Sequence, residues 1–149
     1  MSSIVAGAAR RGPGFVVAPQ VPRMSRHRIV NPPELGAPSG FSHAVLSSGT
    51  TVHLAGQLGA GETIAEQFDS ALERLLIVLA AAGGGPEDLV SLQAFVTDVA
   101  AYKASRQEIG RVWRNRLGRH YPAMGLFGIS ELFEPGAMVE LMGVAVLGG

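Results

Sequence analysis

The order of strand-like and helix-like segments is the feature that most constrains the fold of this chain. Two β-type runs, His43 to Ser48 and Thr51 to Gln57, flank Gly49 and are predicted to pair as a hairpin. From Thr63, a plausible N-cap, the hydrophobic period becomes helical and continues to the stop at residues 83–86. The expected buried stripe of this helix is Ile64, Phe68, Ala71, Leu72, Leu75, Val78 and Leu79.

The second half of the chain continues this alternation of element types. Leu89 to Thr97 alternates as a half-buried strand does, and a second amphipathic helix is predicted over Tyr102 to Leu117. Two more strands are expected at Ala123 to Ile129 and Ala137 to Leu147, which gives the order ββαβαββ. Two helices cannot cover both faces of such a sheet. We therefore expect both helices on one face and self-association through the other, in a trimer or another small ring.

One acid, Glu140, stands inside the otherwise uncharged run from Ala137 to Leu147. So apolar a run is typical of a strand buried on both faces or at a subunit contact, where an unpaired carboxylate is costly. Such a carboxylate needs a charged partner or an opening to water. The alternative is an acid near the end of the strand that reaches solvent or caps backbone N–H groups.

Composition narrows the class of protein. The 149 residues are 47% hydrophobic, which suits one globular domain. The chain has no cysteine, so disulfides, thiolate nucleophiles and cysteine metal sites are excluded. No uncharged apolar stretch reaches the length of a membrane span, and we expect a cytoplasmic protein with no membrane partner.

The net charge is zero, but the charges are unevenly distributed. Five arginines precede the first acid, Glu34, so the N-terminal leader is arginine-rich. We expect residues 1–27 to form a disordered extension and residues 28–149 to form the domain. The leader could be a transit peptide, a nucleic-acid arm, or an upstream extension caused by a start assigned at Met1 instead of Met24. We favour the last of these, since prolines interrupt any long amphipathic helix.

The sequence lacks the catalytic motifs of most enzyme classes. The segment Gly59-Ala60-Gly61 is followed by Glu62, whose charge would oppose a phosphate. The four histidines lack the spacing of metal ligand pairs, so no metal site is expected. Ser42-His43 lacks the Gly-x-Ser-x-Gly elbow, and adjacent residues on a strand face opposite sides, so we expect no nucleophile–base pair there. Glu140 is left as the main candidate.

Six segments of the chain, in this order, carry a family resemblance: Val30-Asn31-Pro32-Pro33, residues 39–45, Leu54-Ala55-Gly56-Gln57-Leu58, Phe95-Val96-Thr97-Asp98, Tyr121-Pro122-Ala123 and Val139-Glu140. Together they resemble the Rid family, also called YjgF or L-PSP. The resemblance covers roughly Arg28 to Leu147 and implies a chorismate-mutase-like α+β fold, with a mixed sheet and two helices on one face. It also implies a homotrimer with ligand clefts at the subunit contacts and no cofactor. The best-known members hydrolyse reactive enamines and imines, such as 2-aminoacrylate, to 2-keto acids and ammonia.

The resemblance also implies roles for single residues. Glu140 matches the acid that orients or activates the attacking water, and is the catalytic candidate. The arginine that normally follows Pro-Ala and binds the substrate carboxylate is replaced here by Met124. The remaining substrate-binding candidates are Phe41 at a position often held by Tyr, Gly56 and Gln57 in the loop lining the cleft, Arg106 as a displaced cation, and His120 at the cleft rim.

Two functions follow from this pattern. The first is a cofactor-free hydrolytic deaminase acting on an imine, enamine or related C–N compound, less anionic than 2-aminoacrylate because Met124 makes the cleft more apolar. The second is a non-catalytic, small-ligand-binding or regulatory trimer. An endoribonuclease is disfavoured, since the acidic body has no basic stripe with interleaved aromatics, and no nucleic-acid partner is expected.

Overall fold

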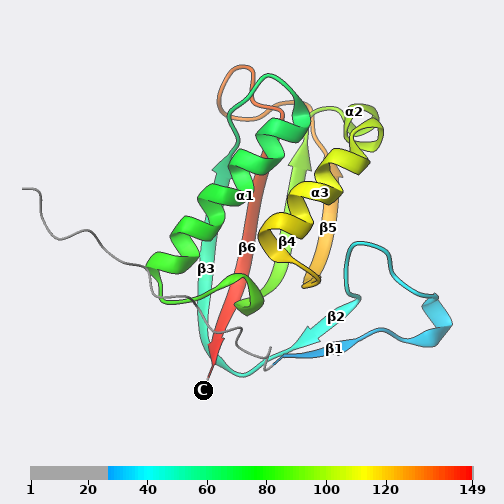
Figure 1. Cartoon of the computed structure of the whole chain (residues 1–149), viewed down its shortest axis with the longest axis vertical. Coiled ribbons are helices and arrows are strands. Elements are labelled where there is room, and N and C mark those ends of the chain that lie inside the picture. Colours follow the sequence, from blue (N-terminus) through cyan, green and yellow to red (C-terminus); the bar gives the residue numbers. More distant parts are fainter. Residues whose placement is uncertain (1–26, 149) are drawn as a thin grey trace, which may run out of the picture.

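A computed structural model describes residues 27–148, and its centre is a four-stranded mixed sheet (Figure 1). The strands lie in the order β3 (Gly49–Leu58), β6 (Val139–Gly148), β4 (Leu89–Val96) and β5 (Ala123–Gly128). The β3–β6 and β6–β4 pairs are antiparallel, whereas β4 and β5 run parallel. The predicted α+β fold with a mixed sheet is confirmed.

All three helices lie on one face of the sheet (Figure 1). They are α1 (Ile64–Ala81), a short α2 (Val99–Ala104) and α3 (Arg106–Leu117). The prediction of one continuous second helix is wrong, because Ser105 leaves helical geometry between α2 and α3. Asp98 begins α2 by accepting a 2.9 Å hydrogen bond from the Ala101 N–H.

Helix α1 begins where its sequence predicts. The Thr63 hydroxyl accepts a hydrogen bond from the Glu66 N–H, and the Glu66 carboxylate accepts one from the Thr63 N–H. The predicted stripe is buried with one exception, Val78, which is 40% exposed. Gln67 is buried instead, because its side chain bonds the loop before β6 as well as the turn before α1.

The predicted hairpin around Gly49 is wrong. Strand β2 (Ala44–Leu46) pairs with β1 (Arg28–Val30), whereas β3 pairs along its length with β6. The central, apolar β6 offers β3 a much longer ladder than β2 can. The arm formed by β1, β2 and the 3-10 turn between them extends beside the start of β5 (Figure 1), where the Ser42 N–H donates to Pro122 O at 3.0 Å.

The core lies between the helices and the sheet. Leu92, Ala94 and Leu141 face the helices and are fully buried. The opposite face of the sheet carries Phe95 and Phe127, whose rings stack with centroids 5.6 Å apart. On this opposite face Met142 of β6 is 38% exposed, whereas Val146 near the end of the strand is 7% exposed.

The structure was also searched for membrane-spanning helices and for metal sites. No helix within residues 27–148 is long and apolar enough to cross a membrane. In the same part of the chain, no three His, Asp or Glu side chains gather in a group that could hold a metal ion. The expectation of a disordered extension concerns residues of which all but His27 lie outside the described range.

Candidate functional site

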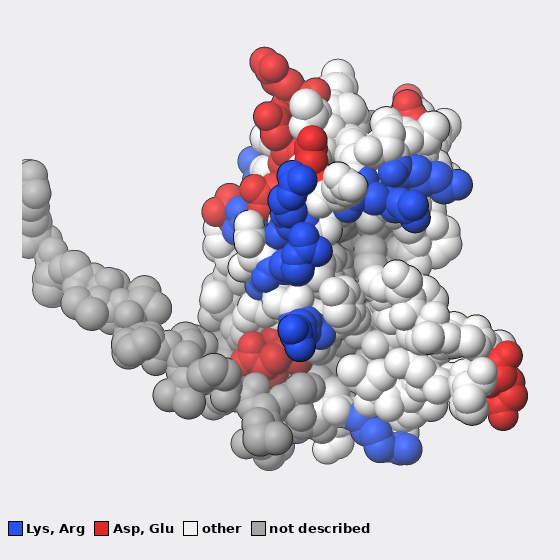
Figure 2. Space-filling model, turned by 45° about the vertical axis from the view of Figure 1, so that its right-hand side comes forward, with Lys and Arg blue, Asp and Glu red and all other residues white. Residues whose placement is uncertain are grey.

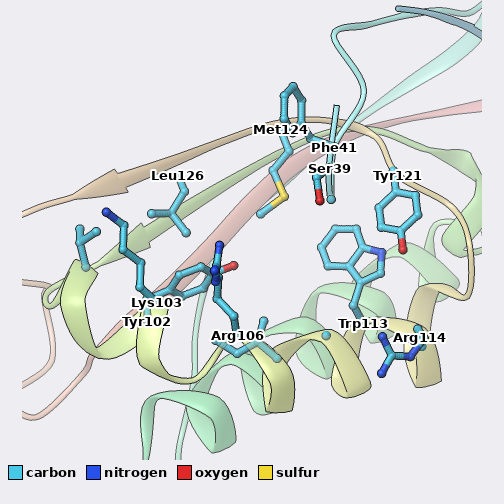
Figure 3. A pocket seen from close by; sticks show the side chains of 14 residues that line it. Ser39, Phe41, Tyr102, Lys103, Arg106, Trp113, Arg114, Tyr121, Met124 and Leu126 are labelled. Atoms are coloured by element: carbon cyan, nitrogen blue, oxygen red, sulfur yellow. The ribbon is translucent and has the colours of Figure 1, made fainter. Parts of the chain in front are cut away.

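A cavity of about 790 Å³ lies between α2, α3, strand β5 and the segment before β2 (Figure 3). This volume falls within the range of small-molecule pockets, roughly 300–1,000 Å³. Aromatic and aliphatic side chains make up most of its wall. Those used below are Phe41, Tyr102, Trp113, Tyr121, Met124 and Leu126.

Met124 lies in this cavity because of the register of β5. Leu92 pairs with Met124, and Ala94 with Leu126, so both β5 side chains share the helix-facing side of the sheet. Figure 3 shows the Met124 thioether pointing down from β5 toward α3. The position that the family resemblance assigns to a carboxylate-binding arginine therefore does line a cavity.

Helix α3 forms the floor of the cavity with three residues spaced four apart. Arg106, Gly110 and Arg114 fall on one face of the helix, and all three line the cavity. Figure 3 shows the Arg106 side chain rising from α3 next to Tyr102, with Arg114 at the opposite end beyond Trp113. A Cβ at position 110 would lie 3.5 Å from Arg114 Nη1, so Arg114 folds back over a residue without a side chain.

The charges around the cavity have one sign. Lys103, Arg106 and Arg114 line it, and no Asp or Glu does. Figure 2 shows Lys and Arg side chains gathered beside a hollow of uncharged atoms on this side of the molecule. Within residues 27–148 the ion pairs are those of Arg116, which joins α3 to Asp69 and Glu73 of α1. The cations at the cavity are therefore available to a ligand.

The aromatic wall is held in place by its own contacts. The rings of Trp113 and Tyr121 stack with centroids 5.8 Å apart and planes 4° apart. Trp113 Nε1 donates a 3.1 Å hydrogen bond to His120 O, which fixes the indole. Burial raises the pKa of Tyr102, while the positive charge of Arg106 acts to lower it, so the guanidinium lies near this ring.

Glu140 lies on the other face of the sheet from Met124. It pairs with Phe95 of β4 and Leu58 of β3, next to a register shift between Leu54 and Gln57. The half-buried carboxylate extends over Gly56, where an added Cβ would overlap its Oε1 atom. Within residues 27–148 no hydrogen bond or ion pair involves this carboxylate.

The structure thus divides the residues predicted from sequence into two groups. Phe41, Met124 and Arg106 line the cavity. Gly56 contacts Glu140 across the β3–β6 pair, where Gln57 pairs with the next residue, Leu141. One chain does not bring these two groups together.

His120 belongs to neither group. Its Nε2 lies 2.6 Å from Leu89 O, to which the ring N–H donates, and it does not line the cavity. Sequence reasoning missed Trp113, Tyr102 and Lys103 as lining residues. The four-residue spacing of Arg106, Gly110 and Arg114 was visible in the sequence, but only the fold shows that this face of α3 meets a cavity rather than solvent.

Comparison with known proteins places these observations in a family. The family model described as endoribonuclease L-PSP matches residues 33–147. The chain belongs to this family. None of the curated proteins matches the sequence at a significant level.

Solved structures of the L-PSP or Rid family share the fold. A Rid-family protein of unknown function from Yersinia pestis is 31% identical with a TM-score of 0.72, covering 83% of this chain and 100% of its own. A member of the YjgF/YER057c/UK114 family from Mycobacterium tuberculosis is also 31% identical, with a TM-score of 0.58 and coverages of 81% and 99%. RidA from an Antarctic Psychrobacter is 25% identical, with a TM-score of 0.58 and coverages of 75% and 92%.

Proposed function

We propose that this Rid-family chain is a cofactor-free hydrolase of reactive imines, enamines or related C–N compounds, and that Glu140 handles the proton and the attacking water. One observation carries the proposal. The Glu140 carboxylate is held over Gly56 on the uncovered face of the sheet, without a hydrogen bond or ion pair within residues 27–148. A carboxylate positioned in this way, with its oxygens free, is suited to general acid–base chemistry.

The reaction needs only water and proton transfers. The protonated imine reacts: water adds to the carbon of the C=N bond while Glu140 takes one of its protons, which gives a neutral carbinolamine. The protonated carboxyl then returns that proton to the amino nitrogen. The C–N bond breaks as the hydroxyl oxygen forms the carbonyl, Glu140 passes the hydroxyl proton to the departing ammonia, and ammonium and a ketone or keto acid leave. An enamine enters the same sequence once its carbon has been protonated.

The proposal requires an assembly, because only a neighbouring subunit can bring the two groups of residues together. Glu140 and Gly56 lie near the β3 edge of the sheet, whereas the cavity lies at the β5 edge. If the uncovered sheet face of one copy packs beside the β5 edge of the next, Glu140 of one subunit can approach the cavity of its neighbour. Head-to-tail contacts of this kind close into rings, and we propose a homotrimer with one cleft at each contact.

Ammonia release tests the proposal directly. Imines are made in situ from several amino acids, and hydrolysis above the spontaneous rate is compared for the natural chain, Glu140→Gln and Met124→Arg. We expect turnover by the natural chain and a loss of about 100-fold or more in Glu140→Gln, since general acid–base catalysis contributes roughly 10²–10⁴-fold. Absence of turnover in all three proteins refutes the proposal. Activity in Met124→Arg alone shows that the natural site serves another purpose.

A further inference from the structure

The cavity beneath Met124 combines a cation with an aromatic wall, and this combination selects a class of ligand. Its volume of about 790 Å³ far exceeds what a three-carbon substrate such as 2-aminoacrylate fills. Trp113 stacks on Tyr121 and is only 6% exposed, so the half-buried Tyr121, Met124 and Leu126 provide most of the apolar surface open to a ligand. A ligand that fills this space needs a sizeable apolar body, best an aromatic ring.

Arg106 supplies the positive charge that Met124 lacks. Figure 3 shows its side chain rising from α3 into the space below Met124 and Leu126. It has no ion pair within residues 27–148, and no acid lines the cavity. A guanidinium in these surroundings binds a carboxylate through two parallel hydrogen bonds. The tyrosine beside it, Tyr102, keeps its hydroxyl proton because burial raises its pKa.

Gly110 makes the approach to Arg106 possible. It lies one turn after Arg106 and lines the cavity. Apart from the helix backbone and the adjacent residues, Arg114 Nη1 is the one atom of the described residues within 4 Å of the position that a Cβ would take there. Arg114 folds back over the same glycine at the far end. The charged head of a ligand and its apolar body can therefore lie along α3, the head against Arg106 and the body against Tyr121 and the exposed edge of Trp113.

We propose that this cavity binds a carboxylate carried on an aromatic or bulky apolar body, with Arg106 on α3 as the carboxylate anchor in place of the residue at position 124. The proposal rests on the function proposed above and names its substrate class: imines or enamines of aromatic or large apolar 2-amino acids. The sequence predicted a less anionic substrate. The proposal changes this prediction, because Arg106 on α3 supplies the positive charge that an arginine at position 124 on β5 would have supplied.

Binding is tested without turnover through Trp113, the single tryptophan of the chain. Its fluorescence is titrated with phenylacetate, with neutral phenylacetamide and with acetate. We expect phenylacetate to change the fluorescence saturably, and the other two compounds to need at least about tenfold higher concentrations, as expected for loss of a charge-assisted bond or of the apolar body. Phenylacetamide binding as tightly as phenylacetate overturns the proposal.

Variants identify the anchor. Arg106→Gln is expected to remove the preference for phenylacetate over phenylacetamide, with an unchanged melting temperature because the side chain is exposed. Arg111→Gln is the matched control, since it removes an exposed arginine of the same helix that does not line the cavity. A preference that survives Arg106→Gln, or that disappears in Lys103→Gln instead, overturns the assignment of Arg106.

Turnover separates this proposal from the proposed function. If imines of alanine and phenylalanine are hydrolysed equally well, through Glu140, the substrate class is wrong and the hydrolase proposal stands. If phenylacetate binds in an Arg106-dependent manner but no imine is hydrolysed, the ligand class stands and the hydrolase proposal fails.

Discussion

At the scale of single residues, the position of Glu140 depends on the glycine beside it. A Cβ at position 56 would overlap the Glu140 Oε1 atom and lie 2.8 Å from its Cδ. We expect Gly56→Ala to displace the carboxylate and to lower kcat for imine hydrolysis by about tenfold or more, because a misplacement of about 1 Å costs up to ~100-fold. The measurement is kcat on the most active imine.

A double variant shows whether this loss acts through Glu140. In a Glu140→Gln background, Gly56→Ala should reduce the residual rate no further, since the group that it displaces is already inactive. An equal loss in both backgrounds contradicts the prediction and indicates a general disturbance of the β3–β6 pair. Melting temperatures of the three variants identify such a disturbance independently.

Single residues also show how far sequence alone can lead. Glu140 is conspicuous because an acid interrupts an apolar run, and this requires no knowledge of the fold. That Met124 faces away from Glu140 depends on the parallel pairing of β4 with β5 and the antiparallel pairing of β4 with β6. Register between distant strands is set by long-range packing, which local patterns do not encode.

At the scale of elements, one buried side chain ties α1 to the loop before β6. Gln67 Nε2 donates to Gly61 O and Gly136 O, both at 3.1 Å, and Gln67 Oε1 accepts from the Met138 N–H at 2.7 Å. We expect Gln67→Leu to lower the free energy of unfolding by about 2–4 kcal/mol, since it removes three bonds and leaves buried partners unsatisfied. Chemical denaturation measures the change.

The matched control for Gln67 is Gln107→Leu. Gln107 is exposed on α3, so the same substitution there should change the free energy of unfolding by less than about 0.5 kcal/mol. Equal effects at the two positions would show that the hydrogen bonds of Gln67 contribute little. Both variants are compared at one protein concentration.

At Gly110 of α3 a substitution is expected to stabilise the protein. A Cβ added there meets Arg114 Nη1 at 3.5 Å, an ordinary contact, and a glycine inside a helix costs about 0.5–1 kcal/mol relative to alanine. Gly110→Ala should therefore raise the melting temperature. Gly128→Ala, whose Cβ would lie 2.7 Å from Val99 Cγ2, should lower it. A lower melting temperature in Gly110→Ala contradicts the helix argument.

Elements were predicted well where their determinants are local. Thr63 with Glu66 caps α1 through side chains three residues apart, and the buried positions of β4 follow its alternation. The predicted hairpin around Gly49 is wrong because β3 pairs with β6, whose residues lie 82 to 99 positions further along the chain. The break at Ser105 was missed because Asp98 starts a separate short helix that the hydrophobic pattern merges with the next.

At the scale of the whole molecule, the uncovered face of the sheet is the main unsatisfied surface. Phe127 is 47% exposed and Met142 38% exposed on this face, and Glu140 lies among such residues. Exposed apolar patches of this kind mark association sites in soluble proteins. The apolar character of β6 predicted a strand buried on both faces or at a subunit contact. Within one chain the helix-facing side of β6 is buried, and on the other side Val146 is buried but Met142 is exposed. A second copy is therefore proposed to cover the exposed part of that face.

Oligomeric mass tests this account of the exposed face. We expect light scattering at micromolar concentration to give three times the 15.5 kDa chain mass, since a ring of three copies covers each sheet. Phe127→Lys places a charge on the uncovered face and should shift the mass toward that of one chain. Ile77→Lys is the control. Ile77 is 63% exposed on α1, and α1 covers the opposite face of the sheet. A monomeric mass for the natural chain contradicts the trimer. It also removes the cleft in which Glu140 of one subunit meets the cavity of the next, so hydrolysis would then have to occur at either group of residues alone.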